Sequence, residues 1–308
     1  MFSDEYNVMN KYVKNDDAGI RLDRWLKENL TDASFTEIQK IIRTGQVRVG
    51  GGRKRSDYRV TSGDEIRIPP NFEFNEKHKS YQIKKDNFLL SDIIVYEDRD
   101  VIVLNKPYGL PTQGGVSAKY HIDSIIKSED PRYRLVHRLD KNTTGALLIA
   151  KNRKAAQYYT EAFNKRVINK KYLALTNNLP KKNSGIMDYP LEIKNKNIAS
   201  DTDKSQEALT YFKIKSSNSD GISLVELTPH TGRKHQIRKH LSMFQCPIIG
   251  DKQYGNQEYP LNIEKKIYLH SYEIIFPNTQ NTRDIRVIVE MPHHFKNAVS
   301  ELGLNFDE

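Results

Sequence analysis

The chain has 308 residues, 37% hydrophobic and 29% charged, enough for about two domains of roughly 150 residues beneath a very polar surface. Its formal net charge of +10 indicates a polyanion or an anionic membrane surface as partner. No run approaches the ~18 apolar residues of a membrane-spanning helix, and a single cysteine excludes an internal disulfide and argues against a structural zinc site.

The N-terminal part of the chain predicts a small mixed α and β unit over residues 16–70. Residues 1–15 are polar and lack the apolar segment of a signal peptide, so we expect them to be frayed and the protein to be cytoplasmic. Apolar residues three and four apart over 22–30 predict a helix. Ser34 and Glu37 form a capping box that begins a second helix.

Two short strands complete this unit. Val47 and Val49 alternate with polar neighbours, and residues 65–68 predict another strand beyond a glycine-rich turn. Gly45 is a plausible left-handed end for the second helix.

Basic side chains gather on the second helix and on the turn beside it. Such a surface suits phosphate contacts, and a solvated polar face is the ordinary alternative. The order of the elements resembles an S4 RNA-binding domain, which favours RNA. The residues that we expect to bind RNA here are Lys40, Arg43, Arg53, Lys54 and Arg55.

Residues 71–92 are interpreted as a linker, because residues 71–87 are polar and charged and show neither helical nor strand periodicity. The second domain is expected over residues 93–308, opening with a hairpin at 93–104. Residues 177–207 are expected to form exposed hairpins or loops. Further strands are predicted at 168–175, 221–227, 267–276 and 285–291, and helices at 155–163, from Ile237 and after Pro292.

One motif stands out in the second domain. It runs from His137 through Arg138, Leu139 and Asp140 to Gly145. The Asp140 carboxylate lies among His137, Arg138 and Lys141, and nearby positive charge favours the ionised form that a nucleophile or base requires. A charged turn between two strands is the ordinary alternative.

The residues of this motif resemble the signature of the RluA family of pseudouridine synthases, in which the aspartate is catalytic. Asn105-Lys106-Pro107 resembles the first motif of that family, residues 231–238 match its TGR-x-HQIR motif, and residues 247–255 match a further phrase. Gln113 and Cys246 stand where the family commonly has histidine, so the sequence departs from the family at these two positions.

The resemblance implies roles for individual residues. The family flips a uridine out of its RNA, with Asp140 as the catalytic group and Tyr172 stacking on the extruded base. Arg238 would pair with Asp140, and Arg138 would fill the vacated stack. A core tyrosine and a surface arginine are the ordinary alternatives for Tyr172 and Arg238. Further RNA contacts are expected from His137, Arg233 and Lys106.

The implied fold is α+β, with a catalytic domain built on a mixed, mostly antiparallel sheet with flanking helices. Because the isomerisation involves neither oxidation nor hydrolysis, no cofactor and no metal are expected. Residues 67–70, 114–115 and 255–256 favour the RluC-like subgroup, which acts on 23S (large-subunit) ribosomal RNA, and we expect a monomer that does not bind membranes. A synthase for transfer RNA and a non-catalytic RNA-binding or ribosome-assembly factor remain alternatives. Whether Asp140 attacks the base, attacks C1′ or removes the C2′ proton stays open.

Overall fold

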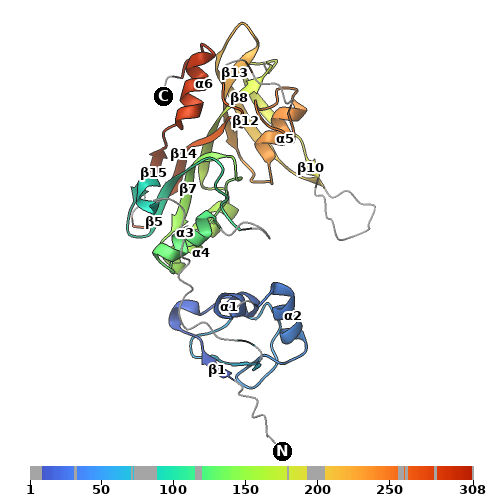
Figure 1. Ribbon diagram of the computed structural model, residues 1–308, viewed down its shortest axis with the longest axis vertical. Helices are drawn as coiled ribbons and strands as arrows, with labels where there is room; N and C mark the ends of the chain where they lie inside the picture. Colours follow the sequence, from blue (N-terminus) through green and yellow to red (C-terminus); the bar gives the residue numbers. More distant parts are fainter. Residues whose placement is uncertain are drawn as a thin grey trace, which may run out of the picture. The chain divides into compact units, whose positions relative to one another are not determined.

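The computed structural model describes most of the chain, in two compact units that span residues 1–80 and 81–308 (Figure 1). The described residues are 9–30, 33–70, 72, 89–114, 120–178, 180–192, 205–255, 260, 263–280 and 283–306. Within them, no helix is long and apolar enough to cross a membrane.

The first unit packs two α-helices on a small antiparallel sheet. Its elements are β1 (Met9–Tyr12), η1 (Asn15–Asp17), α1 (Leu22–Asn29), α2 (Phe35–Arg43), β2 (Arg48–Val49) and β3 (Glu65–Ile68). In the described residues the strand order is β1-β3-β2, and Trp25, Leu26 and Ile38 are buried in its core.

The capping box predicted for α2 is confirmed. Ser34 Oγ accepts from the Glu37 amide at 3.2 Å, and Glu37 Oε2 accepts from the Ser34 amide at 2.8 Å. Gly45 follows the helix at φ +73°, as its left-handed end requires.

The expectation of a frayed N-terminus is wrong for Met9–Tyr12. These residues form β1 and pair with β3, with Met9 opposite Ile68. The strand carries polar residues between its ends, so its apolar pattern is too weak to indicate a strand. Residues 1–8, which belong to the same expectation, lie outside the described residues.

The second unit is built on one large mixed sheet. Its strands are β4 (Ile94–Glu97), β5 (Val101–Lys106), β6 (Arg134–Leu135), β7 (Thr144–Ala150), β8 (Asn169–Asn177), β9 (Ser184–Asp188), β12 (Leu209–Ser217), β13 (Ile222–Pro229), β14 (Leu269–Pro277) and β15 (Asp284–Ile288). The order is β4-β5-β7-β14-β8-β13-β12-β9, with β15 on β14 and β6 on β7. Among the described strands only β7 and β14 pair in parallel, so the predicted mixed, mostly antiparallel sheet is confirmed.

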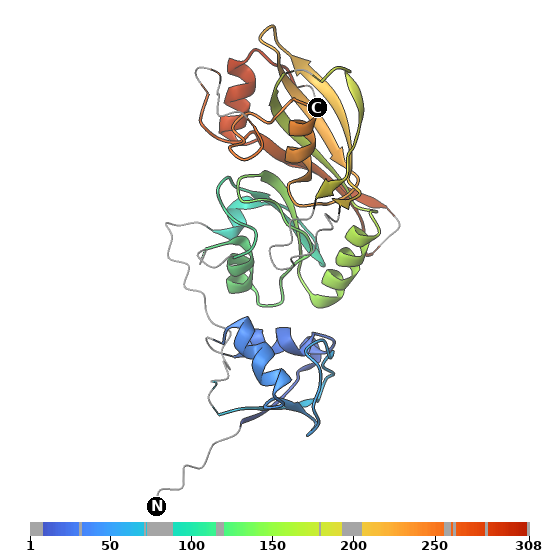
Figure 2. The ribbon, with the colours of Figure 1, turned by 90° about the vertical axis from the view of Figure 1, so that its right-hand side faces the viewer.

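Helices cover both faces of this sheet. They are η2 (Leu90–Ile93), α3 (Ile122–Glu129), α4 (Arg153–Asn164), α5 (Gln236–Met243) and α6 (His293–Glu301). Alternate residues of β7 divide between two cores: Leu147 and Ile149 pack with α3 and α5, whereas Leu148 packs with α4. The α6 helix packs on the face that carries Leu173 of β8. Figure 2 shows α5 and α6 at one end of the unit and α3 and α4 at the other.

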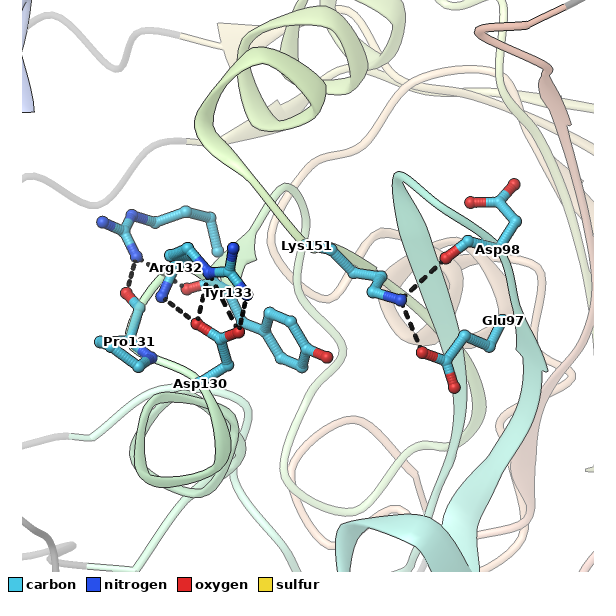
Figure 3. A network of polar contacts seen from close by, with 8 residues as sticks. Glu97, Asp98, Asp130, Pro131, Arg132, Tyr133 and Lys151 are labelled. Carbon is cyan, nitrogen blue, oxygen red and sulfur yellow. Dashed lines mark hydrogen bonds and ion pairs between the residues drawn. The ribbon is translucent and has the colours of Figure 1, made fainter. Parts of the chain in front are cut away.

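Polar contacts close the turns at the end of β7 that is far from residue 144. Lys151 Nζ donates to Glu97 Oε1 at 2.6 Å and to the Asp98 carbonyl at 2.9 Å (Figure 3). The Asp130 carboxylate binds Arg132 in the turn that precedes β6. Exposed ion pairs of this kind contribute only about 0–1 kcal/mol each, so they shape the turns more than they stabilise the unit.

The predicted linker and loops fall partly on described residues and partly outside them. Of residues 71–92, positions 71 and 73–88 lie outside the described residues, whereas Leu90 is buried in the core of the second unit. Residues 177–207 contain β9 and a small antiparallel ladder between β10 (Leu191–Glu192) and β11 (Ser205–Gln206). Residues 193–204 between them lie outside the described residues.

Candidate functional site

A cleft of about 600 Å³ lies beside the loop that carries Asp140. Its volume is in the range of small-molecule and cofactor pockets. The lining includes six of the residues singled out in the sequence: His137, Arg138, Asp140, Tyr172, Arg233 and Arg238. A second hollow of about 420 Å³ shares Arg138, Asp140 and Arg238, so the carboxylate stands between two concave surfaces.

The Asp140 side chain is about a quarter exposed (26%), and two basic side chains approach it without a close hydrogen bond. Arg238 Nη1 lies 3.8 Å from Oδ2, and His235 Nε2 lies 3.6 Å from Oδ1. These distances exceed those of a hydrogen bond. The carboxylate therefore feels positive charge while keeping its oxygens open to a substrate.

The backbone on the N-terminal side of Asp140 is held by a buried threonine. Thr112 Oγ1 donates to the Leu139 carbonyl at 2.6 Å and accepts from the Leu139 amide at 3.2 Å. Thr143 N donates to the Asp140 carbonyl at 3.1 Å and closes the turn. Such contacts fix the position of a reacting group before substrate arrives.

Lys106 holds the other side of the loop, and its ammonium points into the protein rather than toward a surface where RNA could bind. Its side chain is fully buried (0% exposed), and Nζ donates to the carbonyls of Pro107, Leu110 and Lys141 at 3.0, 2.9 and 3.0 Å. Burial lowers the pKa of Lys106 to about 7, although the charge of Asp140 opposes that shift. All three donors of the ammonium are used inside the protein.

His137 belongs to the packing of the site rather than to its positive charges. Its Nε2 accepts from the Leu148 amide at 2.8 Å, and its ring stacks on Phe163 with centroids 4.5 Å apart. Burial, followed by the charge of Lys170, lowers the pKa of His137 to about 3. The sequence counts His137 among the cations around Asp140, whereas the hydrogen bond that Nε2 accepts and the lowered pKa of His137 both favour the neutral ring.

The primary partner of Arg238 is Asp251, which the sequence interpretation missed. Arg238 Nε and Nη2 donate to the two oxygens of Asp251 at 2.6 and 2.7 Å. Burial opposes ionisation of Asp251, but the bonds from Arg238 outweigh it and hold the pKa of that carboxyl below its ordinary value. Asp251 lies in the matched motif at 247–255, so the sequence pointed to this residue but assigned it no role.

His235 is a second residue that the sequence interpretation missed. It precedes α5 in the left-handed region, at φ +55°, and its Nδ1 lies 3.0 Å from the hydroxyl of Tyr254. This conformation costs a non-glycine residue about 1–3 kcal/mol and aims the ring at Asp140. Burial lowers the pKa of His235 despite the attraction of Asp140. The described residues contain no cluster of three or more His, Cys, Asp or Glu suited to a metal.

Tyr172 lies in β8 and contributes its ring to the cleft. The residue is 8% exposed, and burial raises the pKa of Tyr172 to about 12, so the phenol stays neutral. A neutral ring partly open to a cleft can stack on a base.

Gly145 is required where the loop enters the sheet. It adopts φ +103°, and a Cβ there would lie 2.1 Å from the Ser271 carbonyl oxygen. Beside it, Thr144 Oγ1 lies 2.8 Å from His270 Nδ1 in the buried junction of β7 and β14. The glycine thus lets two strands meet directly behind Asp140.

The remaining predicted RNA-binding residues lie at the surface. Arg138 is exposed between the two hollows, and Arg233 is half-buried with Nε donating to the Glu207 carbonyl at 3.0 Å. In the first unit, Arg53 lies over Gly45, because a Cβ at position 45 would be 2.3 Å from its Nε. The exposed cations of that unit are Lys40, Arg43, Arg53, Lys54 and Arg55.

Comparisons with known proteins identify the family. Residues 100–243 match the family described as RNA pseudouridylate synthase, and residues 20–66 match the S4 domain. A protein of Rickettsia typhi named ribosomal large subunit pseudouridine synthase C is 34% identical over 288 residues, which is 89% of this chain and 95% of that protein. This chain belongs to the RNA pseudouridylate synthase family. It is a pseudouridine synthase that carries an S4 domain.

Other relatives agree with this assignment. A synthase of the same name from Buchnera aphidicola subsp. Baizongia pistaciae is 32% identical, over 92% of this chain and 93% of that protein. The solved structure of human RNA pseudouridylate synthase domain containing 4 superimposes with a TM-score of 0.61 at 28% identity, over 71% of this chain and 96% of that one.

Proposed function

We propose that this synthase converts uridine to pseudouridine in large-subunit ribosomal RNA, with Asp140 as its catalytic group. The observation that carries the proposal is the open Asp140 carboxylate in a cleft that also contains Tyr172 and Arg238. Relatives covering about nine-tenths of the chain are named for the large ribosomal subunit, which supports this RNA as the substrate.

The reaction requires a single nucleotide to leave its helix. Unstacking costs a few kcal/mol, and the extruded base must find a partner surface. In our proposal the neutral Tyr172 ring takes the face of the uracil, and the exposed Arg138 side chain occupies the space left in the RNA. These contacts bring the glycosidic bond to Asp140.

The chemistry is an isomerisation in which atoms and electrons balance. The N1–C1′ bond breaks, the C5–C1′ bond forms, C5 loses a proton and N1 gains one. An ionised Asp140 can serve as a nucleophile at the base or at C1′, or as a base at C2′. All three routes need an oxygen that is not already bonded, and the 3.6 and 3.8 Å contacts of Asp140 meet that need.

The S4 domain is proposed to bind the same RNA through phosphates. Its exposed cations lie on α2 and on the turn after β2, and phosphate contacts from such cations add affinity without reading sequence. We further propose that the protein works as a monomer in the cytoplasm.

Replacing Asp140 tests the catalytic assignment. We expect Asp140→Asn to abolish pseudouridine formation and to leave RNA affinity within about threefold, since the isosteric amide keeps the loop but lacks a charge. Single-turnover release of tritium from [5-³H]uridine RNA measures the reaction, and filter binding measures affinity. Asp188→Asn, at an exposed position of β9, is the matched control. Pseudouridine formed at the wild-type rate by Asp140→Asn would refute the assignment.

The substrate is tested by mapping pseudouridines in a deletion strain. We expect sites to disappear from 23S ribosomal RNA and to return with the wild-type chain but not with Asp140→Asn. Sites lost from transfer RNA would instead identify a transfer RNA synthase. Unchanged maps of both RNAs would favour a non-catalytic RNA-binding or assembly factor.

A further inference from the structure

We propose that Lys170, together with Arg166, binds a backbone phosphate of the RNA beside the nucleotide that is seated on Tyr172. The inference rests on the proposed function, because the ligand is a phosphodiester of the RNA substrate. It adds a binding subsite at the end of the cleft formed by α4 and β8.

The alternation of β8 directs two neighbouring lysines to opposite faces of the sheet. Lys170 and Tyr172 both line the cleft. Lys171, between them, faces the other way, where its Nζ binds the buried Glu273 at 2.9 Å. Residues two apart on a strand are about 7 Å apart, which is the scale of one nucleotide. Lys170 is therefore within reach of a phosphate attached to a nucleotide on Tyr172.

Among the described residues, no carboxylate forms an ion pair with Lys170 within 4 Å of its Nζ. Its Nζ lies 5.5 Å from the centroid of the Phe163 ring. The nearby His137 carries no negative charge that could balance the ammonium. Burial lowers the pKa of Lys170 to about 8. A half-buried ammonium without an ion-pair partner among the described residues is unfavourable, and an anion entering the cleft would relieve that cost.

Arg166 supplies a second cation at the same end of the cleft. It follows α4 in the left-handed region, at φ +60°, and its exposed side chain lines the cleft. No carboxylate of the described residues forms an ion pair with it. A guanidinium and an ammonium without acidic neighbours match a phosphodiester, which accepts several charge-assisted hydrogen bonds.

A neutral-linkage scan tests this subsite in the full-length protein. The probe is an RNA stem-loop substrate with single methylphosphonates at the linkages flanking the target uridine, with affinity measured by filter binding. We expect one linkage to weaken wild-type binding about tenfold. Lys170→Met should weaken binding of unmodified RNA by a similar factor, and the neutral linkage should then add almost nothing.

Two further variants keep the test decisive. Lys170→Arg should restore most of the affinity, which a loss of packing alone would not. Lys165→Met is the matched control, because Lys165 is exposed, pairs with Glu161 on the surface and is outside the cleft. If Lys170→Met is poorly folded, Arg166→Gln at an exposed position gives the same comparison.

The outcomes separate the two proposals. Additive effects of the lysine substitution and the neutral linkage at every position would overturn the phosphate subsite, whatever the wild-type activity. Failure of wild-type protein to form pseudouridine would instead overturn the proposed function. A tenfold non-additive effect at one linkage supports the subsite.

Discussion

At the residue scale, one guanidinium is shared unequally between two carboxylates. Arg238 is bonded to Asp251 at 2.6 and 2.7 Å and stands 3.8 Å from Asp140. Asp251 thus satisfies the arginine and sets its direction. Asp140 receives the electrostatic benefit without a tight ion pair, which would occupy the oxygens needed for reaction.

Asp251→Asn tests this division of roles. With Asp251 uncharged, Arg238 should move toward Asp140, and a misplacement of about 1 Å can cost on the order of 100-fold in rate. We therefore expect kcat to fall about 100-fold while KM changes less than threefold. Steady-state rates over a range of RNA concentrations give the two constants, and thermal unfolding checks the fold. Asp130→Asn, which removes an exposed pair with Arg132, serves as the control. A wild-type kcat in Asp251→Asn would show that the arginine needs no such anchor.

The sequence predicts which charged residues belong to the site better than it predicts which of them are buried. Asp140, Tyr172 and Arg238 line one cleft, as the motif match implies. Lys106 and His137 also lie in the matched motifs, yet the side chains of both form hydrogen bonds to the protein backbone. Only tertiary packing decides whether a cation faces water or a carbonyl, and no local pattern records that choice.

At the scale of elements, the site depends on the junction of β7 with β14. The parallel contact spans only Thr144-Gly145 and His270-Ser271. His270 continues it, with Nε2 3.1 Å from the Val289 carbonyl beyond β15. The loop that carries Asp140 is therefore connected to the sheet at a point where the two backbones approach too closely for any side chain at position 145.

Gly145→Ala should damage this junction. The added methyl group would lie 2.1 Å from the Ser271 carbonyl at φ +103°, so we expect a loss of more than about 3 kcal/mol in the free energy of unfolding. Gly221→Ala is a matched control, because that glycine has φ +79° and nothing within 4 Å of its Cβ position, and it should lose only about 1 kcal/mol. Urea denaturation measures both, and equal losses would contradict the steric argument.

Elements with strong local signals were predictable and others were not. The capping box of α2, the β4–β5 hairpin and the long strands β8, β13 and β14 follow from their patterns. The strand β1 is missed because its partner β3, far along the chain, supplies what its own residues lack. The helix α3 is missed although Ile122, Ile125 and Ile126 are spaced for one buried face.

At the scale of the whole molecule, three neutral histidines make the second unit sensitive to acid. Burial lowers the pKa of His137 to about 3 and those of His270 and His294 to about 4. A histidine ionises near pH 6.5 in the unfolded chain. Because the folded-state values are lower, the unfolded chain binds more protons below pH 6.5. Stability is therefore complete above that pH and is lost as the pH falls through 4.

We expect the free energy of unfolding of the second unit to decline steeply between pH 6.5 and 4. Urea denaturation with hydrogen exchange of β7 peptides follows this unit specifically. His137→Gln should reduce the slope by about one proton, because one titrating group is gone. A pH-independent stability over this interval would contradict the burial of these rings.

The parallel pairing of Thr144 with His270 also sets the order in which the enzyme can be made. More than a hundred residues separate these two positions in the chain, and loop closure of that length makes their meeting slow. Because synthesis proceeds from the N-terminus, the S4 domain can fold early, whereas β7 cannot pair with β14 until β14 has been synthesised. We therefore expect a nascent chain that ends before residue 270 to hold a folded S4 domain and an incomplete second unit.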